Sequence, residues 1–507
     1  MSFDIGDLLI RKLQKDTKWR KTIMKKSDEW KVGEHWQQAP SGELKNFDDA
    51  LIARMHPHLM RPATDEERDD VRIALDFNAD DVEVANALGT ARGEHKECGV
   101  QGGVLNLPMD ERFKTDEILL LALARAKVYK QHGMARVISG VDKTGEVHDE
   151  PNLARDLRLL DTGRMVRIPD DRKSDGFRDV KLKVWVMMFS GDYLGAQSML
   201  PFIESPKAHL FCRGCNYDSR SSMAGRPFSF MRDYGEEEPP FVEREWADLK
   251  PKLDHLRAGV SARELKAAYH DLGLNKLYFA LDPEYIPHID PCTVAPQDLL
   301  HLFPDGLLRS ELAWLMYVLL KYDHFTLDKL NARIKQYRGL PRDVRIPPFP
   351  ANLKQGVVGG KPDSSRTARL TGSQCMHFAL DSVEIIDPLL NDEIRANPAW
   401  TSWVKLVELF TVSVQHEMTV DDVERIDDLV LEHSRLFDAV PEYNGLKRPK
   451  HHFLSHLAMD VWLYGPPRGY WCFGFEGFNR VIKYGAKRSN WKNVTVSIMQ
   501  YWSARES

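Results

Sequence analysis

The chain has 507 residues, of which 43% are hydrophobic and 29% are charged, a balance typical of a globular rather than a disordered protein. Its length allows two to four domains, its apolar runs are too short to span a bilayer, and no secretory segment follows the start. The net charge of −5 argues against a surface covered in nucleic-acid contacts, and six sparsely placed cysteines favour reduced thiols in an intracellular compartment.

The first part of the chain predicts a mixed α/β sheet. Residues 71–80 and 100–107 have strand-like patterns, and residues 137–140 are predicted to close the sheet. Residues 115–133 are predicted as a helix between the last two strands. Residues 180–190 alternate and then become continuously apolar, as in a buried central strand. In such sheets, ligands gather at strand ends.

After Cys215 the pattern becomes helical. We expect an N-terminal helical and basic segment (1–65), the first part of a sheet core (66–215), an all-α insertion (216–445) and a C-terminal return to the core (446–507). Within residues 355–372, the Gly-Gly-Lys sequence is not a phosphate loop, because the spacing and the following Pro362 do not fit. The helices of the insertion are predicted near 263–273, 306–322, 326–338, 373–390, 399–416 and 420–439.

Four soft ligands suggest a zinc site that joins distant parts of the chain. Cys212 and Cys215 have the spacing C-x2-C, and His452 and His456 stand at i and i+4, on one face of a helix. Taken alone, the two cysteines fit a redox pair or two buried thiols equally well. Histidines with this spacing are more often surface or core residues than metal ligands. Together they predict a closed, structural Cys2His2 site. The competing ligands are His451 and Cys292.

Carboxylates at strand ends suggest a second kind of metal site. Asp80 and Asp81 close the first strand, Asp192 follows the central strand, and Glu476 begins a predicted final helix. Any one of these acids is more simply a solvated turn residue. Their joint position relative to the cysteines and histidines favours a pair of Mg²⁺ or Mn²⁺ ions, which are suited to phosphodiester transfer.

Two further groups are candidates for contacts with DNA or metal. The first group lies at the start of a predicted helix and consists of Asp298, His301 and Asp305. These residues either start the helix, contribute to the metal site or bind a DNA end. Basic residues near the C-terminus, interleaved with aromatic ones, favour phosphate binding over a merely solvated helix. The predicted DNA-binding residues are Lys450, Arg480, Lys483, Lys487 and Arg488.

These motifs resemble RNase H-like DDE cut-and-paste transposases, the broad group of the CACTA, hAT and KDZ-type elements and the catalytic subunit of the V(D)J recombinase. The first-acid block is similar in residues 78–108, and SGDYLGAQSMLPFIESPKAHLFCRGC resembles the second-acid block followed by C-x2-C. QDLLHLFPDGLLRSEL resembles the insertion motif D-x2-H-D-L-x-E-G, although Leu302 replaces an Asp and Asp305 a Glu. The final block is matched by KRPKHHFLSH, GPPRGYWCFGFEGFN and NWKNV.

The resemblance implies an RNase H-like α/β core, split by the all-α insertion and tied by the Cys2His2 zinc site. It implies that Asp80, Asp192 and Glu476 are the catalytic metal ligands, with Asp81 as the fallback first acid. The implied activity is Mg²⁺- or Mn²⁺-dependent DNA strand cleavage and transfer by a nuclear homodimer on DNA ends, without a membrane partner.

Two alternatives remain at this stage. Because no N-terminal zinc finger or helix-turn-helix is evident, the first is a domesticated, catalytically silent DNA-binding protein. The second is a zinc-stabilised nuclease that only hydrolyses DNA.

Overall fold

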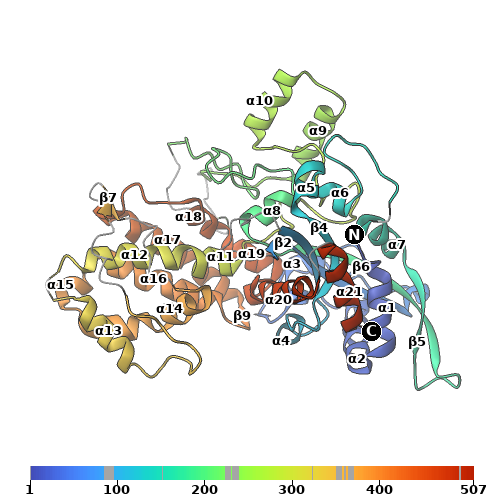
Figure 1. The fold of residues 1–507 in the computed structure, drawn as a ribbon, viewed down its shortest axis with the longest axis horizontal. Coiled ribbons are helices and arrows are strands. Elements are labelled where there is room, and N and C mark those ends of the chain that lie inside the picture. Colours follow the sequence, from blue (N-terminus) through green and yellow to red (C-terminus); the bar gives the residue numbers. More distant parts are fainter. Residues whose placement is uncertain are drawn as a thin grey trace.

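The computed structural model describes residues 2–84, 96–150, 152–222, 230, 239–322, 324–349, 357–358, 361–362, 370–489 and 493–506. Its centre is a five-stranded sheet with the order β4-β3-β2-β6-β5 (Figure 1). Strands β2, β3 and β4 form an antiparallel meander, β6 runs parallel to β2, and β5 is antiparallel to β6. The strands are β2 (Asp70–Glu83), β3 (Lys96–Val104), β4 (Leu119–Arg125), β5 (Arg164–Pro169) and β6 (Phe177–Phe189).

The parallel pair places two of the predicted acids at one edge of the sheet. Phe77 of β2 lies beside Phe189, the last residue of β6, and both strands run in the same direction. Asp80 therefore lies three residues further along β2, and Asp192 three residues beyond the end of β6. The predictions of strands at 71–80, 100–107 and 180–190 are confirmed, with shifted ends.

Two predictions in this region are wrong. Residues 115–133 are not one helix: they contain strand β4, followed by helix α5 (Ala126–His132). Residues 137–140 are not a strand, because their first half ends helix α6 (Met134–Ile138) and a turn follows. The run from Ile118 to Leu123 is fully buried. A strand covered on both faces is apolar throughout, so its pattern resembles that of a buried helix.

The N-terminal residues are helical, as predicted, and belong to the sheet core. Helices α1 (Ile5–Lys15) and α2 (Thr17–Val32) bury Leu9, Trp19 and Ile23 in the same apolar cluster as β2. Helices α3 (Leu51–Met55), α4 (Met109–Arg112), α7 (Leu153–Thr162) and α8 (Tyr193–Met199) complete this part.

From residue 299 onward the insertion is a helical lobe with its own core, on the left in Figure 1, whereas Leu249, Leu253 and Leu274 pack in the sheet core. Each predicted helix is present, and Trp314 and Trp403 are buried at the centre of the lobe. Short strands also occur: β7 (Val357–Val358) pairs with β8 (Lys361–Pro362), and β9 (Met418–Thr419) pairs with β1 (Glu43–Leu44). The rest of the predicted loop up to residue 369 lies outside the described residues. The helices are α9 (Trp246–Arg257), α10 (Ala262–Leu272), α11 (Leu299–Leu302), α12 (Leu308–Leu319), α13 (Leu327–Gln336), α14 (Gly372–Ile386), α15 (Asp392–Arg395), α16 (Pro398–Ser413) and α17 (Val420–Asp438).

The last two helices pack on the sheet core, whereas Phe453 and Leu457, earlier in the C-terminal part, belong to the apolar cluster of the helical lobe. Helix α20 (Phe473–Lys487) lies on β3, where a Cβ atom at Gly99 would come within 2.8 Å of Ile482. Glycine at that position therefore allows the close approach of the helix. The other helices here are α18 (Pro449–Phe453), α19 (Leu457–Tyr464) and α21 (Val494–Glu506). None of the described helices combines the length and hydropathy of a membrane-spanning segment.

Candidate functional site

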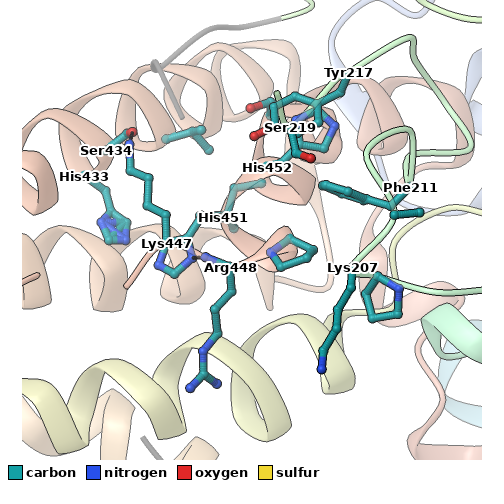
Figure 2. Close-up of a pocket in the computed structure, with 16 residues that line it drawn as sticks. Lys207, Phe211, Tyr217, Ser219, His433, Ser434, Lys447, Arg448, His451 and His452 are labelled. Atoms are coloured by element: carbon teal, nitrogen blue, oxygen red, sulfur yellow. Dashed lines mark hydrogen bonds between the residues drawn. The ribbon is translucent and has the colours of Figure 1, made fainter. Parts of the chain in front are cut away.

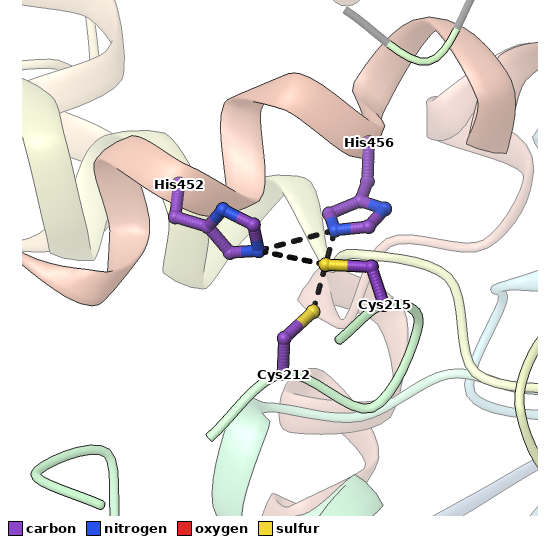
Figure 3. Close-up of side chains that lie close together, drawn as sticks. All are labelled: Cys212, Cys215, His452 and His456. Atoms are coloured by element: carbon purple, nitrogen blue, oxygen red, sulfur yellow. Dashed lines mark hydrogen bonds between the residues drawn. The ribbon is translucent and has the colours of Figure 1, made fainter. Parts of the chain in front are cut away.

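The four predicted soft ligands form one buried cluster. One ligand atom from each of Cys212, Cys215, His452 and His456 lies within 4.8 Å of the other three (Figure 3). Cys212 Sγ is 3.3 Å from His456 Nε2, and Cys215 Sγ is 3.4 Å from His452 Nε2. Two thiols and two imidazoles suit a tetrahedral ion. The cluster can therefore hold a metal ion such as zinc, and it joins segments about 240 residues apart.

The backbone around the cysteines is held from outside the cluster. Arg244 Nε donates hydrogen bonds to the carbonyl oxygens of Cys212 (3.1 Å) and Cys215 (2.9 Å). A Cβ atom at Gly214 would lie 3.3 Å from Cε1 of His456, so a small residue leaves room for the imidazole. These contacts hold the backbone that carries the two cysteines.

The electrostatics of the cluster favour a thiolate at Cys212. Burial opposes ionisation of Cys212, but a hydrogen bond from the Cys215 thiol and the nearby imidazoles hold the pKa of Cys212 well below its usual range. Burial also opposes protonation of His456, yet the Cys212 thiolate raises the pKa of this imidazole. Thiolate is the form of cysteine that binds metals.

The competing ligands lie elsewhere. His451 Nε2 is 3.2 Å from Glu311 Oε1, and its ring stacks on Trp314. Figure 2 shows His451 beside His433 and Lys447 on the wall of a cavity of about 390 Å³, separate from the acids. Cys292 is buried but outside the cluster.

The three predicted acids meet at a second, smaller cavity. Asp80, Asp192 and Glu476 line one space of about 60 Å³, together with Asn78 and His301. Asp192 is the N-cap of α8, where its Oδ1 accepts a hydrogen bond from the amide of Gly195 (2.6 Å). Residues separated by almost 400 positions thus share one site. Asp81 lines the neighbouring groove instead, where the Tyr129 hydroxyl donates to its carboxylate.

An amide chain positions Asp80. Asn479 Nδ2 donates to Asp80 Oδ2 (2.8 Å), and Gln101 Nε2 donates to Asn479 Oδ1 (2.9 Å). Burial raises the pKa of Asp80, and the charges of Asp192 and Glu476 add to this effect against the hydrogen bond from Asn479. Mutual repulsion of carboxylates is the electrostatic setting in which divalent cations bind.

His301 links the insertion to the acids. Its Nδ1 donates to Asp298 Oδ2 (2.6 Å), and its Nε2 lies 3.3 Å from Glu476 Oε1. Burial opposes protonation, but these two carboxylates raise the pKa of His301 to about 10. Asp298 also accepts the amide of Cys472 (2.7 Å), at the N-cap of α20, the helix that carries Glu476. Asp298 and His301, at the start of α11, therefore orient Glu476.

The remaining predicted residues divide into two groups. Asp305 pairs with Arg309 and does not line the acid cavity. Lys450 differs from the expectation of a phosphate contact, because its Nζ donates to the carbonyl oxygens of His301 and Asp305. Burial lowers the pKa of Lys450. Exposed positions on α20 and just beyond it are occupied by Arg480, Lys483, Lys487 and Arg488.

Sequence reasoning missed Asn479 and Gln101. Asn479 follows Glu476 by three residues, so the two share a face of α20. That spacing was the sequence pattern that could have revealed Asn479 as a neighbour of the third acid. Gln101 lies inside a strand and had no signal of its own.

Comparisons with known proteins do not identify a family for this chain. A scan against protein-family models found no match to the chain. A search of curated proteins found no significant match either.

Proposed function

We propose that this protein is a DDE-type, transposase-like enzyme with an RNase H-like core, which cleaves DNA strands and transfers their 3′ ends in a reaction that depends on divalent metal ions. The observation that carries the proposal is the convergence of Asp80, Asp192 and Glu476 on one cavity. A nuclear location and a homodimer on paired DNA ends belong to the same proposal through the resemblance described above.

The donor set fits the ions that the proposal requires. Three carboxylates from separate elements supply only oxygen atoms, which Mg²⁺ and Mn²⁺ prefer. Bound there, two ions would activate an attacking hydroxyl group and stabilise the departing one. In the first reaction water cleaves the phosphodiester and leaves a free 3′-hydroxyl. In the second, that hydroxyl attacks a target phosphodiester and displaces a new 3′-hydroxyl.

The protein's own part is to position the oxygen donors. The parallel ends of β2 and β6 hold Asp80 and Asp192 at one edge of the sheet, and Asn479 fixes the Asp80 carboxylate. His301 and Asp298 hold the start of α20 and thus Glu476. Such supporting hydrogen bonds orient ligands and tune their basicity.

We assign the Cys2His2 cluster to a structural zinc ion. All four ligand residues are buried, and the set offers no open position of the kind that catalytic zinc sites keep. Zinc there would tie the residues before the insertion to those after it. The acids could then meet across the insertion.

Strand cleavage tests the catalytic proposal directly. The substrate is a supercoiled plasmid that carries the DNA flanking the protein's own coding sequence, incubated with Mg²⁺ or Mn²⁺. We expect nicking by the wild type and at least about a hundredfold loss in Asp192→Asn and Glu476→Gln, which remove a charge without creating a cavity. Asp305→Asn is the matched control, because that acid lies outside the cavity and is the rival third ligand.

The outcomes are distinct. If Asp305→Asn abolished nicking while Glu476→Gln did not, the assignment of the third acid would be wrong. A folded wild type that binds this DNA and never cleaves it with either metal would favour the domesticated binder.

A further inference from the structure

A large groove adjoins the acid cavity. Its volume is about 880 Å³, within the roughly 300–1,000 Å³ typical of ligand sites. Asp80 and Asp192 line both the groove and the acid cavity. Helices α5 and α8 and the segment from α10 to Phe279 form its walls, and Figure 1 shows α10 above α5 and α8. A molecule that fills this groove therefore contacts two of the three acids.

The charge in the groove favours an anion away from the acids. Lys130 and Lys143 line it and are exposed, and no ion pair of either is found within the described part of the chain. Lys276, by contrast, pairs with Glu204 (2.7 Å) and donates to the carbonyl oxygen of Gln197. Lys130 and Lys143 thus place exposed positive charge on the wall formed by α5 and the segment after α6, and Lys96 of β3 also lines the groove.

The same groove offers apolar faces. Leu194, two residues after Asp192, is 54% exposed although it is a leucine. Tyr269 of α10 lines the opposite wall, and no hydrogen bond of its hydroxyl group is found among the described residues. The Tyr129 ring is fixed, because its hydroxyl donates to both oxygens of Asp81 at 2.7 Å. Rings and an exposed leucine beside lysines are what unpaired bases and their phosphates require.

We infer that this groove binds the unpaired segment of a DNA single strand, whose phosphodiester backbone continues into the acid cavity. The inference rests on the proposed function for the direction of the strand. Lys130 and Lys143 contact phosphates, and Tyr269 stacks on a base. A duplex fits less well, because its base faces are covered by stacking and are closed to the tyrosine.

Binding without cleavage tests the groove. The probes are a fluorescently labelled ten-nucleotide single strand and a blunt duplex of the same sequence, measured by anisotropy at several salt concentrations without divalent metal. We expect the double variant Lys130→Gln and Lys143→Gln to weaken single-strand binding about tenfold. It should also flatten the slope of log K against log salt by about 1.4, since each phosphate contact on a single strand contributes about 0.7.

Variants of Tyr269 distinguish the loss of base stacking from a general loss of structure. Tyr269→Ala should weaken single-strand binding by about five- to thirtyfold and duplex binding much less, whereas Tyr269→Phe keeps the ring and the affinity. Lys127→Gln on α5 and Lys266→Gln on α10 are matched controls, because both residues are exposed on the same helices but do not line the groove. Thermal unfolding of each variant checks the fold.

The groove and the proposed activity fail separately. Groove variants that bind the single strand like the wild type would overturn the inference, even if the protein cleaves DNA. Equal losses for single strand and duplex would overturn it as well. If the expected losses appear and the plasmid is never nicked, the groove stands and the catalytic proposal falls.

Discussion

The Cys2His2 cluster and the acid cavity both join residues from opposite ends of the chain, but they differ in donor type and in access. The cysteines and histidines are buried, and their soft donors lie close to one another. The acids face a small cavity that adjoins a groove, and Glu476 keeps 47% of its side chain exposed. A closed set of soft ligands serves structure, whereas an open set of oxygen donors leaves positions for a substrate.

The two sites also depend on each other through the insertion. The cluster ties the segment after α8 to α18 and the turn that follows it, and the acid site receives His301 from α11 and Glu476 from α20. Loss of the first site should therefore disturb the second, while the reverse is not expected. The following changes test this asymmetry, beginning with the largest expected effect.

The largest effect is expected from removing a soft ligand. Cys215→Ser or His456→Ala should lower bound zinc and reduce the free energy of unfolding by about 4 kcal/mol, because metal binding in such sites is coupled to folding. Elemental analysis and urea unfolding measure the two changes. Strand cleavage should fall with them.

Cys292→Ser is the control for this prediction. Cys292 is a buried thiol outside the cluster, so its substitution should leave zinc content unchanged and cost about 1 kcal/mol. Wild-type protein that contains no zinc after purification without chelators would contradict the assignment.

Much of the sheet was predictable because strands β2 and β6 carry clear apolar patterns between polar ends. Asp80 and Asp192 could be placed close together for the same reason, since each lies three residues beyond the last pair of β2 and β6, Phe77 and Phe189. Strand β4 was missed because its residues from Leu119 to Ala124 are apolar and buried on both faces, and burial on two sides removes the period that separates strand from helix.

The candidate site was predictable only in part. Motif order placed Glu476 with the other acids through the resemblance, since no local pattern links residues separated by almost 400 positions. The inward direction of Lys450 depends on the carbonyl groups of a turn around Pro304, which no spacing rule reveals. The amide chain from Gln101 to Asp80 is a product of tertiary packing.

Asn479 tests how the acid site depends on the position of the Asp80 carboxylate. Asn479→Ala should reduce cleavage about 10- to 100-fold and raise the Mn²⁺ concentration needed for half-maximal rate, because it removes the donor that positions Asp80. Zinc content should not change. Asn331→Ala on α13 is the matched control, because that side-chain amide bonds the backbone of Phe349, outside the acid cavity. An unchanged Mn²⁺ requirement would show that Asn479 does not position a metal ligand.

Stability should depend on pH through a carboxyl group on β2, two residues before Asn78, which lines the acid cavity. Asp76 is fully buried, and burial raises its pKa to about 8 although Ser190 donates two hydrogen bonds to it. The folded protein therefore holds a proton that the unfolded chain releases near pH 4. Stability is highest below about pH 4 with respect to this group, and it falls as the pH rises from about 4 to about 8.

Asp76→Asn should remove this dependence. Between pH 5 and pH 8, we expect the variant to lose less stability than the wild type, by on the order of 2 kcal/mol, in urea unfolding of metal-free protein. Asp305→Asn, at a part-buried acid with an arginine partner, is the comparison variant. Parallel stability profiles of wild type and Asp76→Asn would refute the prediction.

The smallest effects are expected on the surface of α20. Replacing Lys483, Lys487 and Arg488 with glutamine should weaken duplex binding about three- to tenfold and flatten its salt slope by up to about 2.7, since each phosphate contact contributes about 0.9. Lys450→Gln should leave that slope unchanged and instead lower stability by about 1 kcal/mol, because its Nζ is held by the carbonyl oxygens of His301 and Asp305. Anisotropy at several salt concentrations distinguishes the two. If Lys450→Gln flattened the slope as much as a surface lysine, the inward contact would not persist in solution, and Lys450 would return to the DNA-binding set.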